Sequence, residues 1–190
     1  MNILAIDTTS TGLSIALVKG DETYSFTKQI GKSGHSATLM PEIDNMLESH
    51  AVNVNDLDAV AVNVGPGSFT GIRIGVSAMT AIAFATGAKR IAVTTFELIA
   101  HQRGKILAAV DAGHGNTYFA KCENGKVLSA SFCEAGENIE LKKAEYQPLK
   151  SVDETLAEVA KQKAKNGEFV QVFEPFYMRK SQAEREKDEV

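Results

Sequence analysis

The apolar residues of the first hundred positions fall into short runs typical of strands and into helically spaced sets typical of helices. Residues 2–7 and the alternating residues 13–18 predict a β-hairpin whose first strand ends at Asp7. A third strand is expected over 23–30. The continuous apolar runs at 56–65 and 90–95 predict strands that are covered on both faces of a sheet.

Two helices are predicted between these strands. In the first, roughly 36–49, apolar residues recur at helical spacing at Leu39, Ile43, Met46 and Leu47. The second, 71–87, ends at Gly87, a residue suited to a C-cap. It is apolar around most of its axis, so it should be buried on more than one side. One side can lie on the sheet, and the other needs the 36–49 helix or a second protein molecule, so this helix pair is a predicted interface.

The second half of the chain begins by repeating the plan of the first. Residues 3–20 and 106–125 each read as an apolar strand, an aspartate, a turn of small residues, an alternating strand and a glycine. Superposing Asp7 on Asp111 aligns Ile15 with Phe119. Any two β-hairpins share some of this pattern, but the repeat favours two similar domains, 1–103 and 104–190. A strand near 126–134, an irregular acidic stretch and a helix near 152–165 follow.

The glycine-rich loop "NVGPGSFTGIRIG" at 63–75 has two interpretations, a phosphate site or a tight turn. A Walker loop needs a lysine and then Ser or Thr after its last glycine, but Ile72 and Arg73 follow Gly71. A dinucleotide fingerprint fails as well, since Gly65, Gly67 and Gly71 carry one residue too many before the last glycine. A strand-to-helix turn is therefore favoured over a phosphate site.

Few residues have the spacing of a catalytic or metal site. The four histidines lack metal-ligand spacing, and Cys122 and Cys133 fit buried free thiols better than a metal or redox pair. Asp7 and Asp111, each at the end of a strand and the start of a turn, are the carboxylates that catalysis could use. In that position an aspartate is more often a turn former.

Composition excludes some classes of protein. Hydrophobic residues make up 44% of the chain and charged residues 23%, as in a folded globular protein. The formal net charge is −4, and no region is strongly basic, so independent binding of a polyanion is not expected. Neither a leader nor a membrane span is evident, and a cytoplasmic location with no membrane partner is expected.

Several segments together resemble one family. They are "ILAIDTTSTGLSIAL", "GHSATLMPEIDNML", "VAVNVGPGSFTGIRIG", "ILAAVDAGHGNTYFA" and the terminal "EPFYMR". The chain is similar to the bacterial TsaB (YeaZ) family, the non-catalytic subunit of the machinery that makes threonylcarbamoyladenosine in transfer RNA. The resemblance implies an α/β fold of the actin, sugar kinase and Hsp70 type (ASKHA, ribonuclease H-like) with duplicated domains. The second domain, with few helices after its hairpin, is expected to be reduced.

The resemblance also implies a supporting role beside the catalytic paralogue TsaD. Thr95 and Ile99 stand where TsaD carries the two histidines of its metal motif, and neither side chain can replace an imidazole. The chain is expected to pair with TsaD, to meet TsaE through the complex, and to form a homodimer when TsaD is absent. Contact with tRNA would be indirect or weak. The implied interface residues are Leu39, Ile43, Met46, Ile72, Arg73, Val76, Met79 and Ala83.

No cofactor is expected for the isolated subunit. In the wider fold, aspartates at the Asp7 and Asp111 positions flank ATP phosphates and magnesium, but residues 126–190 lack an evident glycine-rich adenine element. ATP binding should be weak or absent. The alternative hypothesis is an ATP-dependent kinase or ATPase that uses these two aspartates.

Overall fold

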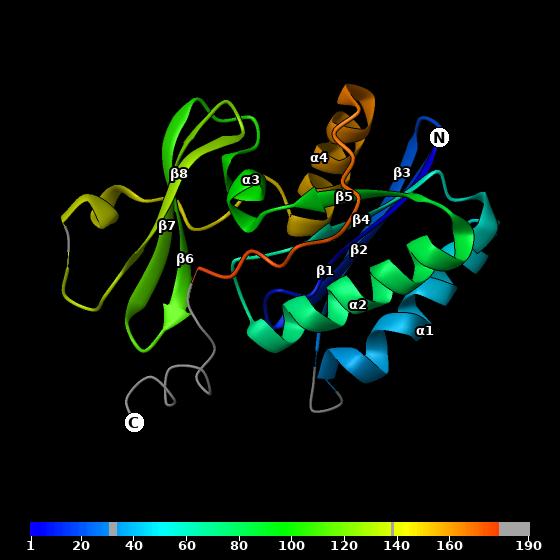
Figure 1. Cartoon of the computed structure of the whole chain (residues 1–190), viewed down its shortest axis with the longest axis horizontal. Helices are drawn as coiled ribbons and strands as arrows, with labels where there is room; N and C mark the ends of the chain where they lie inside the picture. Colours follow the sequence, from blue (N-terminus) through cyan, green and yellow to red (C-terminus); the bar gives the residue numbers. More distant parts are fainter. Residues whose placement is uncertain (31–33, 138, 179–190) are drawn as a thin grey trace.

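The computed structural model describes residues 1–30, 34–137 and 139–178, which form two sheets. The five-stranded sheet has the order β3-β2-β1-β4-β5, and the three-stranded sheet has the order β6-β7-β8 (Figure 1). The first contains β1 (Asn2–Asp7), β2 (Gly12–Lys19), β3 (Glu22–Gln29), β4 (Ala59–Asn63) and β5 (Lys89–Val93). The second contains β6 (Lys105–Gly113), β7 (Asn116–Glu123) and β8 (Lys126–Cys133).

The five-stranded sheet is mixed, and its strands β1, β2 and β4 are buried on both faces. β1 pairs antiparallel with β2, and β2 with β3, whereas β1, β4 and β5 run parallel. Alternate residues of β1 enter different cores: Leu4 and Ile6 lie in one cluster of buried residues, and Ile3 and Ala5 in the other. The continuous apolar runs therefore reflect two covered faces, as predicted. β4 is shorter than expected because residues 54–56 form the short 3-10 helix η1 (Val54–Asp56) before it.

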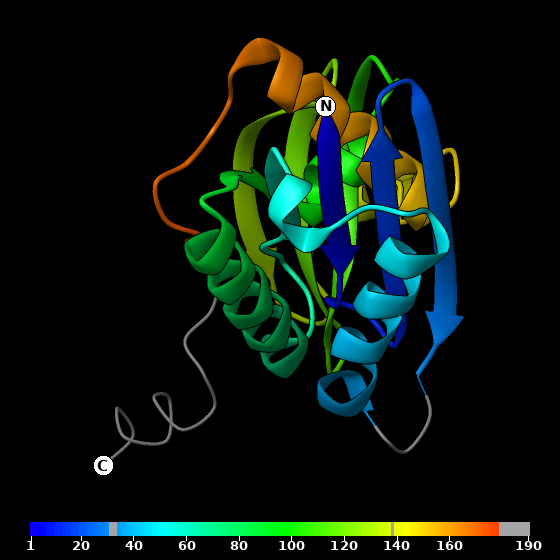
Figure 2. The ribbon, with the colours of Figure 1, turned by 90° about the vertical axis from the view of Figure 1, so that its right-hand side faces the viewer.

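Helices from distant parts of the chain cover the two faces of this sheet. α1 (Gly34–Ser49) and α2 (Phe69–Thr86) lie on one face, and α4 (Val152–Asn166) lies on the other (Figure 2). α2 ends as predicted at Gly87, whose φ of 75° is left-handed. α4 thus completes the first lobe although it belongs to the second half of the sequence. The division into domains 1–103 and 104–190 stays a prediction.

The second lobe is a smaller unit built on α3 (Thr95–Ala100) and the β6-β7-β8 sheet. Phe96 and Ile99 of α3 pack against Ala108, Ala120 and Cys122 of the sheet. The irregular stretch that follows contains the 3-10 helix η2 (Ile139–Lys143) and a parallel bridge between Glu145 and Ala108 of β6. This arrangement confirms the expected α/β class with a repeated hairpin and a reduced second lobe.

The repeat of the two hairpins is real, but its second strand was aligned one residue out of place. Ile15 faces Ile6 across the first hairpin, and Tyr118 faces the corresponding Val110 across the second. Ile15 therefore corresponds to Tyr118, and the predicted match with Phe119 is wrong. The cause is the shorter second turn, where a register shift follows Asp111.

Residues 169–178, here called the C-terminal strap, cross between the lobes (Figure 1). Val170 forms an antiparallel bridge with Arg90 at the edge of β5. Phe176 donates its backbone N–H to the Val64 carbonyl at 2.8 Å, and its ring packs against both the first core and the core of the second lobe. The strap therefore fastens the two lobes together.

Candidate functional site

A cleft of about 700 Å³ lies between the lobes and brings the two candidate aspartates into one site. Asp7 and Thr9 come from the β1–β2 turn of the first lobe, and Asp111 comes from β6 of the second. Thr95 and Tyr146 also line it. The sequence therefore identified both aspartates as residues of one site, although it gave no sign of the segment that carries Tyr146.

The Asp7 carboxylate accepts three hydrogen bonds from the protein at the floor of this cleft. Its Oδ1 accepts from the backbone N–H and the hydroxyl of Thr9, both at 2.7 Å, and its Oδ2 accepts from Asn63 Nδ2 at 2.8 Å. Asp7 is only 5% exposed, and Asn63 is fully buried. A carboxylate held in this way organises the turn after β1 and has little capacity left for substrate or metal.

Asp111 is the accessible carboxylate of the pair. Its Oδ1 accepts the backbone N–H of Gly113 at 2.7 Å, a local turn contact, and its side chain is exposed. No group of three or more His, Cys, Asp or Glu side chains in the described ranges is placed to hold a metal ion. The two aspartates thus occupy turn positions, the commoner role for aspartate there.

The glycine-rich loop permits close packing of α2 against the β1–β2 turn. A Cβ atom at Gly71 would lie 1.9 Å from the Thr8 carbonyl oxygen, and one at Gly67 would lie 2.5 Å from the Thr9 carbonyl oxygen. Ser68 N–H donates to the Thr9 carbonyl, and Ser68 Oγ caps the helix by accepting from Gly71 N–H. Protein atoms therefore occupy the surroundings of two amides at the start of the helix. This geometry supports the tight-turn interpretation.

The charge of the cleft does not suit a polyphosphate. None of the lysines, arginines or histidines in the described chain lines it, whereas several hydroxyl groups and two aspartates do. ATP would bring further negative charge beside Asp7 and Asp111 without a protein cation to balance it.

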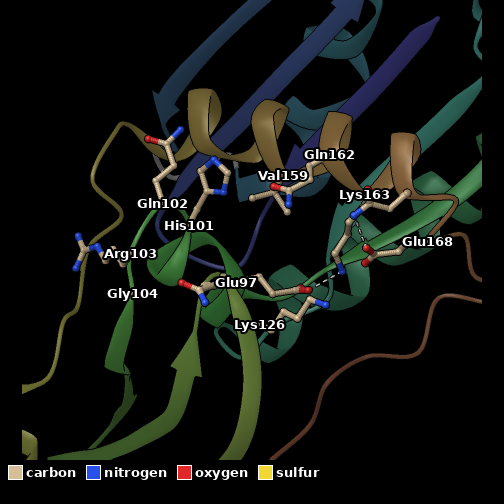
Figure 3. Close-up of a pocket in the computed structure, with 13 residues that line it drawn as sticks. Glu97, His101, Gln102, Arg103, Gly104, Lys126, Val159, Gln162, Lys163 and Glu168 are labelled. Carbon is tan, nitrogen blue, oxygen red and sulfur yellow. Dashed lines mark hydrogen bonds and ion pairs between the residues drawn. The ribbon is translucent and has the colours of Figure 1, made fainter.

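A second cavity of about 440 Å³ lies between α3, the β7–β8 turn and α4 (Figure 3). Lys163 of α4 points toward Glu97 of α3, with 2.6 Å between the Nζ and Oε1 atoms. Glu97 also completes the capping box of α3, in which its Oε2 accepts from the Thr94 N–H and hydroxyl. Lys163 and Glu97 thus form an ion pair beside this cavity. This ion pair connects α4 to α3 of the second lobe.

A second tie joins the same helices at His101. His101 Nε2 lies 2.9 Å from Glu158 Oε2, and Lys150 also pairs with the Glu158 carboxylate. The hydrogen bond from Lys150, with a further one from His101, lowers the pKa of Glu158 below its ordinary value. This carboxylate thus serves as an ionised junction between α4, α3 and the segment that precedes α4.

Thr95 and Ile99, where the resemblance implies histidines in TsaD, make structural contacts in this protein. Thr95 donates its hydroxyl to the Pro66 carbonyl at 2.7 Å and also contacts Asn63. Ile99 is 2% exposed and packs in the core of the second lobe. Neither side chain offers a metal ligand of the histidine type.

The structure places the implied interface residues in two groups. Six of them are at most 5% exposed and form part of the monomer core; these are Leu39, Ile43, Met46, Ile72, Met79 and Ala83. Arg73 is exposed, and Val76 is half-buried. The six therefore hold α1 and α2 on the sheet or on each other, and in this conformation they cannot touch a partner directly. Their assignment to an interface stays a prediction.

The outward surface of α1 and α2 carries other side chains. Met40 is 43% exposed on α1, and Phe84 is 85% exposed near the end of α2. Figures 1 and 2 show this helix pair on the side of the first sheet that faces away from α4, and the second-lobe sheet does not cover it. Phe84 is the residue that sequence reasoning counted as apolar but did not select.

One described helix, α2, is long and apolar enough by length and composition to cross a membrane. Its inner face is buried on the sheet at residues that include Ile72 and Met79. The same composition is typical of a core helix in a folded domain.

Strand order and the repeated hairpin define the class of protein. A sheet ordered β3-β2-β1-β4-β5, followed by a second hairpin of the same plan across a cleft, is the duplicated ribonuclease H-like arrangement of the actin and sugar-kinase class. A family model described as "TsaD: tRNA N6-adenosine threonylcarbamoyltransferase" matches residues 29–158. The chain therefore belongs to the family of this model.

Individual relatives agree with this assignment. The chain is 27% identical over 136 residues to the tRNA threonylcarbamoyladenosine biosynthesis protein TsaB of Haemophilus influenzae, a match that covers 68% of this chain and 57% of the relative. The chain thus spans little more than half the length of that relative.

Solved structures show the same fold. YeaZ from Pseudomonas aeruginosa superposes with a TM-score of 0.71 at 22% identity, covering 89% of this chain and 94% of that one. A protein with similarity to peptidase YEAZ from Pseudomonas aeruginosa gives a TM-score of 0.75 at 23% identity, covering 94% and 99%.

Proposed function

We propose that this protein is a non-catalytic subunit in the biosynthesis of threonylcarbamoyladenosine, pairing with TsaD to support threonylcarbamoyl transfer to adenosine in tRNA. The family assignment gives the pathway, and the printed name of the Haemophilus influenzae relative agrees with it. The outward surface of α1 and α2 is the proposed contact with TsaD.

The observation that carries this proposal is that the candidate groups of the interlobe cleft make hydrogen bonds or packing contacts within the protein itself. Asp7 accepts three hydrogen bonds inside the protein, and Asp111 accepts a turn hydrogen bond. Thr95 and Ile99 take structural positions where the paralogue has histidines. A protein that keeps this fold without these groups contributes through binding.

The surface proposed for TsaD is supported by exposed apolar side chains on a rigid helix pair. Phe84 is 85% exposed, and a large aromatic side chain exposed on a helix is a frequent anchor of protein interfaces. Met40 adds a second exposed apolar side chain on α1. In the same proposal, TsaE meets this chain through the complex, and a homodimer forms on this surface when TsaD is absent. Contact with tRNA is indirect, which agrees with the net charge of −4. The expected location is the cytoplasm.

A second candidate is an ATP-dependent kinase or ATPase, favoured by the single cleft that holds both Asp7 and Asp111. The purified protein separates the two candidates. The subunit hypothesis expects no ATP turnover above blank, and the enzyme hypothesis expects magnesium-dependent turnover that Asp111→Asn abolishes. A micromolar dissociation constant for ATP by calorimetry would also contradict the proposed absence of ATP binding.

The proposal is tested by co-purification with TsaD of the same organism, followed by a tRNA modification assay with and without this chain. Phe84→Glu should keep the fold, because the side chain is already in solvent, and should abolish pairing by placing a charge in the contact. Leu128→Glu is the matched control, since Leu128 is also exposed, at 65%, but lies on β8 of the second lobe. Pairing that survives Phe84→Glu, or modification that is equal without this chain, would contradict the proposal.

A further inference from the structure

Four exposed residues form one stripe along the outer face of α2. Arg73, Ser77, Thr80 and Phe84 are all exposed, and their spacing of four, seven and eleven residues from Arg73 keeps them within about 40° of one line on a helix. A rise of about 1.5 Å per residue places Arg73 and Phe84 about 16 Å apart along the helix axis. The large side chains of Arg73 and Phe84 thus lie at the two ends of the stripe, with the small side chains of Ser77 and Thr80 between them.

Aromatic residues hold the Arg73 side chain in place at one end of this stripe. The centre of its guanidinium lies 4.0 Å from the centroid of the Phe69 ring, one turn earlier on α2. Its Nε donates to Tyr177 Oη at 3.2 Å. The Phe69 and Tyr177 rings pack on each other with 4.8 Å between centroids, so the C-terminal strap supplies one side of the clamp.

The two terminal nitrogens of Arg73 have no hydrogen-bond acceptor among the described residues. Within those residues, the Arg73 side chain makes one hydrogen bond, to Tyr177, and one cation–π contact, with Phe69. Two other exposed cations are instead paired: Lys28 with Glu42, and Lys105 with Glu123. A guanidinium presents its N–H groups in a planar fork that matches a carboxylate. Because the side chain is already held, binding would cost less side-chain entropy than for a free arginine.

We propose that Arg73 is a preorganised anchor for a carboxylate of the protein partner, with Phe84 as the apolar contact at the other end of the same stripe. The proposal rests on the proposed function and adds the chemistry of the partner. The partner should present an Asp or Glu side chain about 16 Å from an apolar pocket that accepts a phenyl ring. Tyr177 is then a positioning residue that acts through Arg73.

The test measures the dissociation constant of the TsaD complex by calorimetry at two salt concentrations. Arg73→Gln should weaken pairing about 10- to 100-fold, the range expected for a lost hydrogen bond to a charged group. Arg73→Lys should recover only part of this, since an ammonium lacks the fork, and Tyr177→Phe should cost a smaller factor because the ring remains. Lys121→Gln, which removes an exposed cation on β7, is the control and should leave the constant within about twofold.

The outcomes separate this inference from the proposed function. Arg73→Gln protein that is folded by circular dichroism and binds TsaD as tightly as wild type overturns the inference and leaves the subunit role intact. Wild-type protein that does not bind TsaD overturns both. Arg73→Gln that loses affinity for pyrophosphate but not for TsaD would identify an anion site and also overturn the protein-docking inference.

Discussion

Replacing Gly71 with alanine tests whether the glycine-rich loop exists for close packing. Gly71 is buried in the first turn of α2, directly against the turn that follows β1. An added Cβ would lie 1.9 Å from the carbonyl oxygen of Thr8 and 3.0 Å from its carbonyl carbon. Both atoms belong to the backbone, so no side-chain rotation can relieve the overlap, and α2 must move away from the sheet.

The expected destabilisation follows from two opposing contributions. Overpacking of a close contact typically costs about 1–3 kcal/mol. Moving α2 would also stretch the hydrogen bond from the Thr8 hydroxyl to the Gly71 carbonyl, now 2.7 Å, which adds about 1 kcal/mol. Alanine has the better helix propensity by up to about 1 kcal/mol, which offsets part of this. We expect a net loss of about 1–4 kcal/mol.

The assay is urea denaturation followed by circular dichroism, with Gly104→Ala as the matched control. A Cβ at Gly104 meets no atom within 4 Å, and its φ is not left-handed, so this variant should match wild type within about 0.5 kcal/mol. Gly71→Ala that is as stable as Gly104→Ala would refute the close-packing argument. It would also reopen the loop as a phosphate site.

Three further predictions follow from burial and bonding. Asp7→Asn should lower the free energy of unfolding by about 1–3 kcal/mol, because the amide would face the Asn63 donor, whereas Asp111→Asn should change it by less than about 1 kcal/mol; urea melts compare the two. Met79→Glu should prevent stable folding, since it buries an unpaired charge, and circular dichroism without any partner would show this. Burial, assisted by a nearby carboxylate, raises the pKa of Cys122 to about 11. An unfolded thiol ionises near pH 9 while the folded one stays protonated, so stability should fall from pH 9 toward 11, and Cys122→Ala should remove that part of the fall in pH-dependent melts.

The strands and long helices were predictable because their apolar patterns are nearly complete. Alternation in the two hairpins and the continuous run of β4 have one simple structural solution, a sheet covered as the pattern requires. α3 was missed because its six residues are too few for a helical period, although Thr94 and Glu97 already formed a capping-box signature. The position of α4 could not be predicted, since its amphipathic pattern says that it packs on something and not on which sheet.

The sequence predicted which residues lie in the candidate site better than it predicted what those residues do. Asp7 and Asp111 do share one cleft, as the repeat indicated, but only the structure showed that Thr9 and Asn63 consume the Asp7 carboxylate. The interface assignment stays a prediction; Met79 and its neighbours are buried in the monomer core, because periodicity marks apolar faces without showing which of them the protein's own core fills.

The route of the chain through α4 has a consequence for synthesis. The face of the first sheet that holds Ile3 and Ala5 is covered by Leu156 and Ala160, which the ribosome makes more than a hundred residues later. A nascent chain that has completed β5 therefore exposes the apolar face of the sheet that α4 later covers. Such an intermediate is expected to need a holdase chaperone. The amino-terminal lobe expressed by itself should aggregate unless α4 is supplied as a separate peptide.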